Sequence, residues 1–255
     1  MATSSRSVLA PPAPPTQRRP YTSSVTPSRS YFNTSIGTKV LIGATGLLLL
    51  AYLILHLLGN LLVFLGPETF NGYSHLLISN PLIIPVEIGL GAIFFLHIYK
   101  TVTNYIANWR ARPVKYHKTA WTGRPSRKSV ASSTMIFSGL TVLAFVLIHL
   151  FQFKYGPGYL VEQGQPEAGV RDLYRLEVEV FGNILNVVFY VFCMVVIGSH
   201  LWHGIASAFD SLGADHPRLT PLLLRGGKVL ATVIAVGFMV IPVWVFFIAR
   251  SGATG

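Results

Sequence analysis

Charged residues are scarce in this chain, and acidic residues are the scarcest. Charged side chains make up 11% of the 255 residues, with 20 Lys and Arg against 9 Asp and Glu. Soluble domains carry about 25% charged residues, so this composition excludes an ordinary water-soluble domain. Cysteine is nearly absent as well, because Cys193 is the only one. The chain alone therefore cannot form a disulfide, hold an iron–sulfur cluster or attach a c-type haem through Cys-x-x-Cys-His.

A glycine-rich dinucleotide-binding motif is also lacking, and long apolar segments dominate the sequence, whose mean hydropathy is +0.53. A membrane-spanning helix needs about 20 apolar residues. Five runs reach that length: 39–65, 81–106, 131–153, 180–207 and 224–249. The alternation of apolar and polar residues that membrane strands require is absent. We therefore expect an all-α integral membrane protein with five transmembrane helices, in which helices 1–4 form a bundle and helix 5 is peripheral.

The basic residues are concentrated in three segments, namely before the first span, between the second and third, and between the fourth and fifth. They are Arg6, Arg18, Arg19, Arg29, Lys39, Arg110, Arg112, Lys115, Lys118, Arg124, Arg127, Lys128, Arg218, Arg225 and Lys228. The positive-inside rule then predicts a cytoplasmic N-terminus and an outer C-terminus. We expect the protein to lie in a bacterial inner membrane. Since these charges lie in short loops at one face, membrane lipid is the expected partner and nucleic acid is not.

The N-terminal segment 1–34 is rich in Pro, Ser, Thr and Arg and contains no acid. It cannot bury a core, so we expect a disordered cytoplasmic tail. Its composition also fits an organelle transit peptide, although its proline content disfavours an amphipathic targeting helix. The membrane domain is expected over 35–250, followed by a short C-terminal tail, 251–255. No internal repeat is evident from the sequence.

Four histidines lie inside four different spans, and such residues mark functional sites because an unsatisfied imidazole is costly in hydrocarbon. At 1.5 Å per residue, His56 and His149 lie roughly 25 and 27 Å from the inner face. His97 and His200 lie roughly 14 and 15 Å from that face. The depths thus match in two pairs, as two haems held by bis-histidine ligation require. The alternative is that each histidine only hydrogen-bonds a neighbouring helix.

The fourth span contains a second candidate ligand. His203 lies about 60° around the helix from His200, so both can face inward, although depth favours His200. Small residues lie at the same levels as the histidine pairs: Gly46, Gly89, Gly91 and Gly139. They either leave room for porphyrins or serve ordinary small-residue helix packing.

Several short motifs surround the four histidines in a characteristic order and spacing. They are Thr34-Ser35-Ile36-Gly37, Thr45-Gly46, His56-Leu57-Leu58-Gly59-Asn60, Gly66-Pro67-Glu68-Thr69-Phe70-Asn71, Asn108-Trp109-Arg110-Ala111-Arg112-Pro113, His149-Leu150-Phe151 and His200-Leu201-Trp202-His203-Gly204. With these motifs, the chain from about Ser35 to Arg250 resembles the single-chain, dihaem cytochrome b558 anchors of succinate dehydrogenase (complex II). It departs from many relatives at Ser133, where a basic residue is common, and from some fumarate reductases at Gly198, where a glutamate occurs.

The resemblance implies a membrane-anchor cytochrome b subunit of succinate:quinone oxidoreductase with two b haems. The distal haem is expected on His56 and His149, and the proximal haem on His97 and His200. A FAD-containing flavoprotein subunit and an iron–sulfur subunit are the implied partners, and the complex can form higher oligomers. Electrons from succinate oxidation would then reach a membrane quinone, expected to be menaquinone, and this chain would contribute only the quinone-reducing step of the respiratory chain.

Quinone reduction needs a proton-exchanging group and hydrogen-bond donors at membrane depth. Glu87 is placed at the level of the distal haem, Asn60 follows His56 by one turn, and His75 follows the first span. These three residues are our candidates for an outer quinone pocket, and the alternative for Glu87 is a hydrogen bond to a neighbouring helix. Three basic residues near the inner face are candidate partners of the proximal haem's propionates: Lys39, Lys100 and Arg110.

Two other functions fit parts of the sequence. One is the cytochrome b anchor of a hydrogenase or formate dehydrogenase, which also uses transmembrane histidines but lacks the motif contexts given above. The other is a haem-free membrane anchor or transporter. The basic segment 110–128 is a candidate docking face for the iron–sulfur subunit, and it equally serves simply to set the topology.

Overall fold

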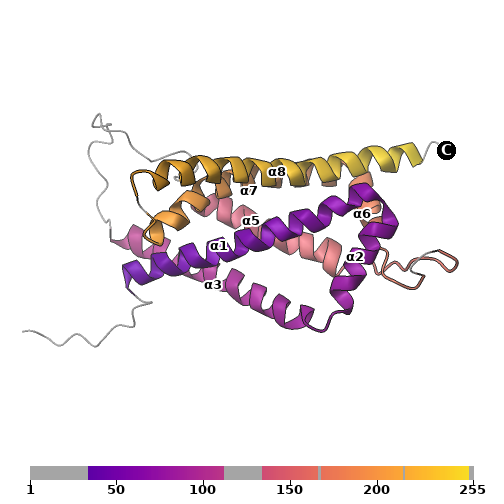
Figure 1. The fold of residues 1–255 in the computed structure, drawn as a ribbon, viewed down its shortest axis with the longest axis horizontal. Coiled ribbons are helices and arrows are strands. Elements are labelled where there is room, and N and C mark those ends of the chain that lie inside the picture. The colour runs from indigo at the N-terminus through magenta and orange to yellow at the C-terminus, as the bar shows by residue number, and fades with distance from the viewer. Residues whose placement is uncertain (1–33, 112–133, 166–167, 215, 253–255) are drawn as a thin grey trace, which may run out of the picture.

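The computed structural model describes residues 34–111, 134–165, 168–214 and 216–252 (Figure 1). Nearly all of the expected N-terminal tail, most of the basic segment 110–128 and part of the C-terminal tail lie outside these described residues. The interpretations placed on those segments therefore stay predictions.

Five helices are long and apolar enough to cross a membrane, so the expected all-α, five-span fold is confirmed. They are α1 (Ser35–Asn60), α3 (Ile83–Arg110), α5 (Met135–His149), α7 (Ile184–Ser211) and α8 (Leu219–Gly252). A 3-10 turn, η2 (Leu61–Leu65), extends α1, and a π-helical turn, η3 (Leu150–Lys154), extends α5. The bounds of the spans agree with the sequence-based ones to within about a turn or two.

Two short helices, α2 (Pro67–Ser79) and α6 (Leu173–Gly182), precede α3 and α7. Both lie at the end of the bundle opposite Ser35 (Figure 1), and we did not expect either from the sequence. The fourth span was expected to begin at 180, but the helix is interrupted at Asn183, and α7 begins after it. There the Asn183 side chain accepts a hydrogen bond from the Leu185 amide, which caps α7. Residues 180–182 belong instead to α6.

The four histidine-bearing helices form a ring. Helix α1 packs against α3 and α7, and α5 packs against the same two helices. Consequently α1 lies diagonally opposite α5, and α3 lies diagonally opposite α7. Helix α8 lies outside this ring and packs along α7, with further contacts to α6 and α1 (Figure 1). The four-helix bundle with a peripheral fifth span is therefore present as expected.

The buried core lies mainly where α1, α7 and α8 meet, and its most deeply buried side chains include Cys193, Ile234 and Val245. Helix α3 contrasts with it, since none of its residues is buried. Its apolar side chains are open instead, with Phe95 75% and Ile88 69% exposed. Lipid can cover such an apolar surface in a multi-pass membrane protein, because the backbone N–H and C=O groups of a helix are hydrogen-bonded within the helix.

Candidate functional site

The His56–His149 pair comes from two diagonally opposite helices. The ring centroids lie 5.8 Å apart, and the ring planes are inclined by 85°. Tyr52 stacks on His56 at 5.4 Å, and Phe145 stacks on His149 at 5.6 Å. Aromatic contact with Phe238 of α8 completes the surroundings of His56. The two imidazoles thus face each other within a largely apolar, aromatic environment.

The His97–His200 pair comes from the other diagonal, α3 and α7. The two rings lie close enough for their charges to interact. The Thr45 hydroxyl of α1 lies 3.1 Å from Nδ1 of His97, and the Ser138 hydroxyl of α5 lies 2.9 Å from Nδ1 of His200. Each histidine of this pair is therefore oriented by a hydroxyl of a neighbouring helix.

The two pairs lie at different levels of the bundle. Thr45 precedes His56 by eleven residues, and Ser138 precedes His149 by the same number. At 1.5 Å per residue, the two levels are about 16 Å apart along the helices. His56 and His149, which the sequence paired by depth, thus face each other at one level, and His97 and His200 lie at the other.

Polar contacts also hold the Nδ1 atoms of the His56–His149 pair. The Tyr190 hydroxyl lies 3.4 Å from Nδ1 of His149 and donates to Oε1 of Gln152 at 2.6 Å. Asn60 Nδ2 donates to the carbonyl oxygen of His56 at 2.8 Å and lies 3.4 Å from its Nδ1. Second contacts of this kind fix the ring orientation of metal-binding histidines.

A local irregularity in α5 begins directly after His149. The π-helical turn η3 follows this residue, and such turns occur frequently at functional sites. The Arg171 guanidinium donates to the carbonyl oxygen of Phe153 at 2.9 Å, which satisfies a backbone group at the end of the turn. Phe153 in turn lies 5.2 Å from the His149 ring. Arg171 thus helps to hold the segment that presents His149.

The segments that begin with the two hydroxyl residues are similar in sequence, although no internal repeat was expected. Residues 45–56 (TGLLLLAYLILH) and 138–149 (SGLTVLAFVLIH) align without gaps, with five identical positions. Both begin with a hydroxyl residue and glycine, both place an aromatic residue four before the terminal histidine, and that aromatic ring stacks on the histidine. Helices α1 and α5 therefore carry the same arrangement on opposite sides of the bundle.

Glycines leave space at both levels. A Cβ atom on Gly46 would lie 3.3 Å from Cε1 of His97, and one on Gly139 would lie 3.7 Å from Cε1 of His200. On α3, a Cβ atom on Gly89 or Gly91 would meet no atom within 4 Å. The glycines at the histidine pairs permit close approach of the imidazoles, and those on α3 border open space.

The three predicted quinone-site residues have different surroundings. Asn60 lies against His56, as described above. Glu87 forms an ion pair with Lys154, the last residue of η3, and also lies within electrostatic reach of Tyr52. This pairing is the helix-to-helix contact that the sequence left open for Glu87. His75 is exposed on α2.

The predicted propionate partners are placed toward the Ser35 end of the bundle. Lys39 and Arg110 are exposed, whereas Lys100 is half-buried with its Nζ 6.0 Å from the Tyr99 ring centroid. His203, the alternative ligand, is half-buried. Since Ser138 contacts the ring of His200, the geometry favours His200 as the inward-facing histidine of α7.

A buried carboxyl group lies outside the spans, near the His56–His149 level. Glu177 of α6 is 4% exposed, and its Oε2 has no hydrogen-bond partner. Burial raises the pKa of Glu177 to about 8, so the group is largely protonated at neutral pH. Its electrostatic influence extends to Tyr190. No signal in the sequence distinguished it from the other acids of this loop region.

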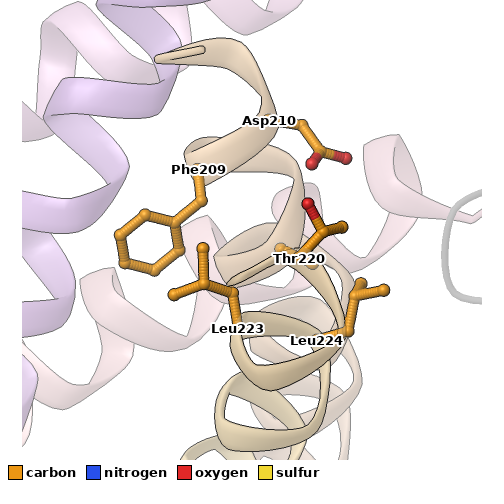
Figure 2. Close-up of a pocket in the computed structure, with 6 residues that line it drawn as sticks. Phe209, Asp210, Thr220, Leu223 and Leu224 are labelled. Carbon is orange, nitrogen blue, oxygen red and sulfur yellow. The ribbon is translucent and has the colours of Figure 1, made fainter. Parts of the chain in front are cut away.

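A crevice at the other end of the molecule lies between the end of α7 and the start of α8 (Figure 2). Figure 2 shows Phe209 and Leu223 on one side of it and Asp210 with Thr220 on another. It has no space for a water molecule. The crevice is therefore a packing seam between two helices.

Paired histidines suit an iron porphyrin, which needs one axial ligand on each face. Metal–imidazole bonds of about 2 Å place the centroids of two opposing rings about 6 Å apart, close to the 5.8 Å between His56 and His149. The occupied Nδ1 atoms and the glycines at both levels fit the same group. Within the described residues, no three His, Cys, Asp or Glu side chains gather to hold a metal ion by themselves.

No family model, curated protein or solved structure matches the chain. The fold and the site define its class on their own terms. The protein is an all-α, multi-pass membrane protein with two histidine pairs inside its helical bundle.

Proposed function

We propose that this protein is the membrane-anchor cytochrome b subunit of a succinate:quinone oxidoreductase and binds two b haems. The observation that carries the proposal is the arrangement of four histidines in two diagonal pairs at two levels of one bundle. Bound there, the haems would supply one-electron transfer between the two levels. His56 and His149 would bind the distal haem, and His97 and His200 the proximal one.

The residues around the outer histidines would keep the distal site rigid. Tyr52 and Phe145 stack on the imidazoles of His56 and His149. Gln152 and Tyr190 extend a polar network from His149 toward the end of the bundle. Held by two histidines, each haem would transfer electrons and would not bind oxygen.

The electron donors would be partner subunits, since this chain has one cysteine and no dinucleotide-binding motif. A flavoprotein subunit would oxidise succinate, and an iron–sulfur subunit would dock on the cytoplasmic face. In the proposed orientation, the Ser35 end of the bundle would face the cytoplasm, and α2 and α6 would lie at the outer face of a bacterial inner membrane. The excess of Lys and Arg in the segments at the Ser35 end supports it.

The acceptor would be a quinone, with menaquinone as the expected type. Asn60 and Glu87 lie at the level of the distal pair. Glu87 forms an ion pair with Lys154 and interacts electrostatically with Tyr52. Glu87 would serve as the proton-exchanging group of the quinone site. His75 would serve at the exposed surface of α2. Lys39, Lys100 and Arg110 would pair with the propionates of the proximal haem.

The test is purification from native membranes with the partner subunits, followed by haem quantitation per anchor chain. We expect two b haems, a reduced-minus-oxidised spectrum of b type, and co-purifying flavoprotein and iron–sulfur subunits. Hydrogenase or formate dehydrogenase subunits in the same preparation would assign the chain to the other cytochrome b class. A preparation without any b-type band would exclude a cytochrome and leave a haem-free anchor or transporter.

A further inference from the structure

We infer that Thr45 and Ser138 are positioning residues that fix the tautomer of the inner histidine pair and tune the reduction potential of the haem it binds. The inference rests on the proposed function, since it concerns histidines taken as haem ligands. It goes beyond the proposed function by assigning a role to two hydroxyls that contact the histidine rings and would not contact the iron. Each hydroxyl accepts the Nδ1–H of its histidine, which leaves Nε2 as the nitrogen available to iron.

The hydrogen bonds of the hydroxyls determine this direction. A hydroxyl has one hydrogen to donate and can accept through its lone pairs. Thr45 Oγ1 lies 2.6 Å from the carbonyl oxygen of Leu41, and Ser138 Oγ lies 3.0 Å from that of Met135. A carbonyl can only accept, so we assign each hydroxyl hydrogen to the carbonyl oxygen of its own helix. The contacts to His97 and His200 are then donated by the rings, and a neutral imidazole with Nδ1–H has a bare Nε2.

The position of the two hydroxyls repeats in the bundle. They are equivalent residues of the repeated segments 45–56 and 138–149, and each is followed by a glycine that faces the same ring. Each repeat thus contributes an outer ligand at its end and a support for the inner ligand of a neighbouring helix at its start. Thr and Ser commonly bond to the preceding turn of their own helix. Thr232 of α8, which is exposed, and Ser211 of α7, which is half-buried, also do so, which makes them matched controls.

The outer pair is held differently. His56 lies against the amide of Asn60, and His149 lies against the phenol of Tyr190. A change at Thr45 or Ser138 should therefore act on one haem only. An acceptor on Nδ1–H makes an imidazole a more basic ligand, which favours ferric over ferrous iron. Removal of the acceptor should raise the potential of the inner haem.

The experiment is a redox titration of the purified, haem-loaded complex, followed by its b-type absorption, for Thr45→Val, Ser138→Ala and the double variant. Thr45→Ser and Ser138→Thr keep the hydroxyl, and Thr232→Val and Ser211→Ala remove one elsewhere. The couple that disappears in His97→Ala identifies the inner haem. We expect the midpoint potential of that couple to rise. The preference for ferric over ferrous iron should fall threefold to tenfold, and a tenfold change corresponds to ~59 mV for one electron. The hydroxyl-keeping variants and both controls should match the wild type.

Each other outcome has a distinct meaning. An unshifted inner couple, or equal shifts of both couples, would overturn the inference while leaving the haem-binding function intact. If a variant loses the inner haem, the haem count decides: loss in Thr45→Val with retention in Thr45→Ser supports the role of the hydroxyl, and loss in both overturns it. A wild-type protein without b haem would instead overturn the proposed function and this inference with it.

Discussion

His56 and His149 face each other across the bundle with centroids 5.8 Å apart and ring planes inclined by 85°. They are separated by 93 positions in the chain, and each is supported by an aromatic ring from its own helix one turn earlier. Such stacking restricts the rotamers of both imidazoles. Each histidine of the pair is therefore held by a ring of its own helix.

Replacement of one outer ligand should remove one haem. His56→Ala leaves His149 without its counterpart, so the haem content should fall from two per chain to about one, as bis-histidine ligation requires both imidazoles. The change is measured by haem quantitation of the purified complex. His216→Ala, which alters an exposed histidine outside the spans, should keep the full content. Equal haem content in wild type and His56→Ala would exclude His56 as a ligand.

Enlargement of Gly46 should affect the other level. Because a Cβ atom there already lies 3.3 Å from Cε1 of His97, Gly46→Leu forces the imidazole out of its position. Overpacking of this kind costs about 1–3 kcal/mol and displaces neighbouring side chains. We expect the inner haem to be lost while the outer one stays, as seen in the haem content and the redox titration. Gly226→Ala, where a Cβ meets no atom within 4 Å, is the control. Retention of both haems with unchanged potentials in Gly46→Leu would contradict this prediction.

The sequence was sufficient for the spans and for the pairing of the histidines by depth. Both depend on quantities that a helix fixes locally, namely apolar length and a rise of about 1.5 Å per residue. The contacts of the histidines were beyond its reach, because they depend on the rotation of one helix against another. Thr45 and His97, for example, are 52 positions apart. The resemblance included Thr45 in a motif without a role, and Ser138 was overlooked.

Two further misses have local causes. Helices α2 and α6 are short and carry polar residues, so the hydropathy that reveals a span does not reveal them. The repeat of α1 in α5 shares only five identical positions and was hidden among similar Leu-, Val- and Ile-rich segments. Glu87 was expected near the distal level, yet its ion-pair partner Lys154 follows from the geometry of the π-helical turn.

The Tyr190 hydroxyl links two polar groups that would otherwise lose a partner. Tyr190→Phe removes the donor to Gln152 and the acceptor for His149, while the aromatic contacts with Phe181 at 4.9 Å remain possible. An unsatisfied buried polar group costs about 1–3 kcal/mol. We expect a lower thermal midpoint for the detergent-solubilised protein. Tyr155→Phe, at a side chain that is 70% exposed, should leave the midpoint unchanged. Equal midpoints for Tyr190→Phe and wild type would show that the network contributes nothing to stability.

Glu177 should make the stability of the protein depend on pH. Burial raises its pKa from 4.5 to about 8 in the folded state, so the folded protein holds this proton more tightly than the unfolded chain does. Stability then decreases as pH rises wherever the folded state binds more protons. The sign is therefore fixed: below about pH 4.5 both states are protonated and ionisation of the carboxyl has no effect on stability, between 4.5 and 8 stability falls, and above 8 the loss is complete. One pKa unit corresponds to about 1.4 kcal/mol, so the full effect reaches several kcal/mol at most.

Glu177→Gln keeps the size of the side chain and removes the proton equilibrium. We expect the thermal midpoint of this variant to exceed that of the wild type at pH 8 and to approach it at pH 5, in detergent at constant ionic strength. Glu162→Gln, at an exposed position of the loop before α6, should follow the wild type over the whole range. Burial raises the pKa of the neighbouring Tyr174 phenol, so it keeps its proton over this interval, and a difference that grows with pH points to the carboxyl group itself. Parallel curves for Glu177→Gln and wild type would contradict a raised pKa of the buried Glu177 carboxyl group.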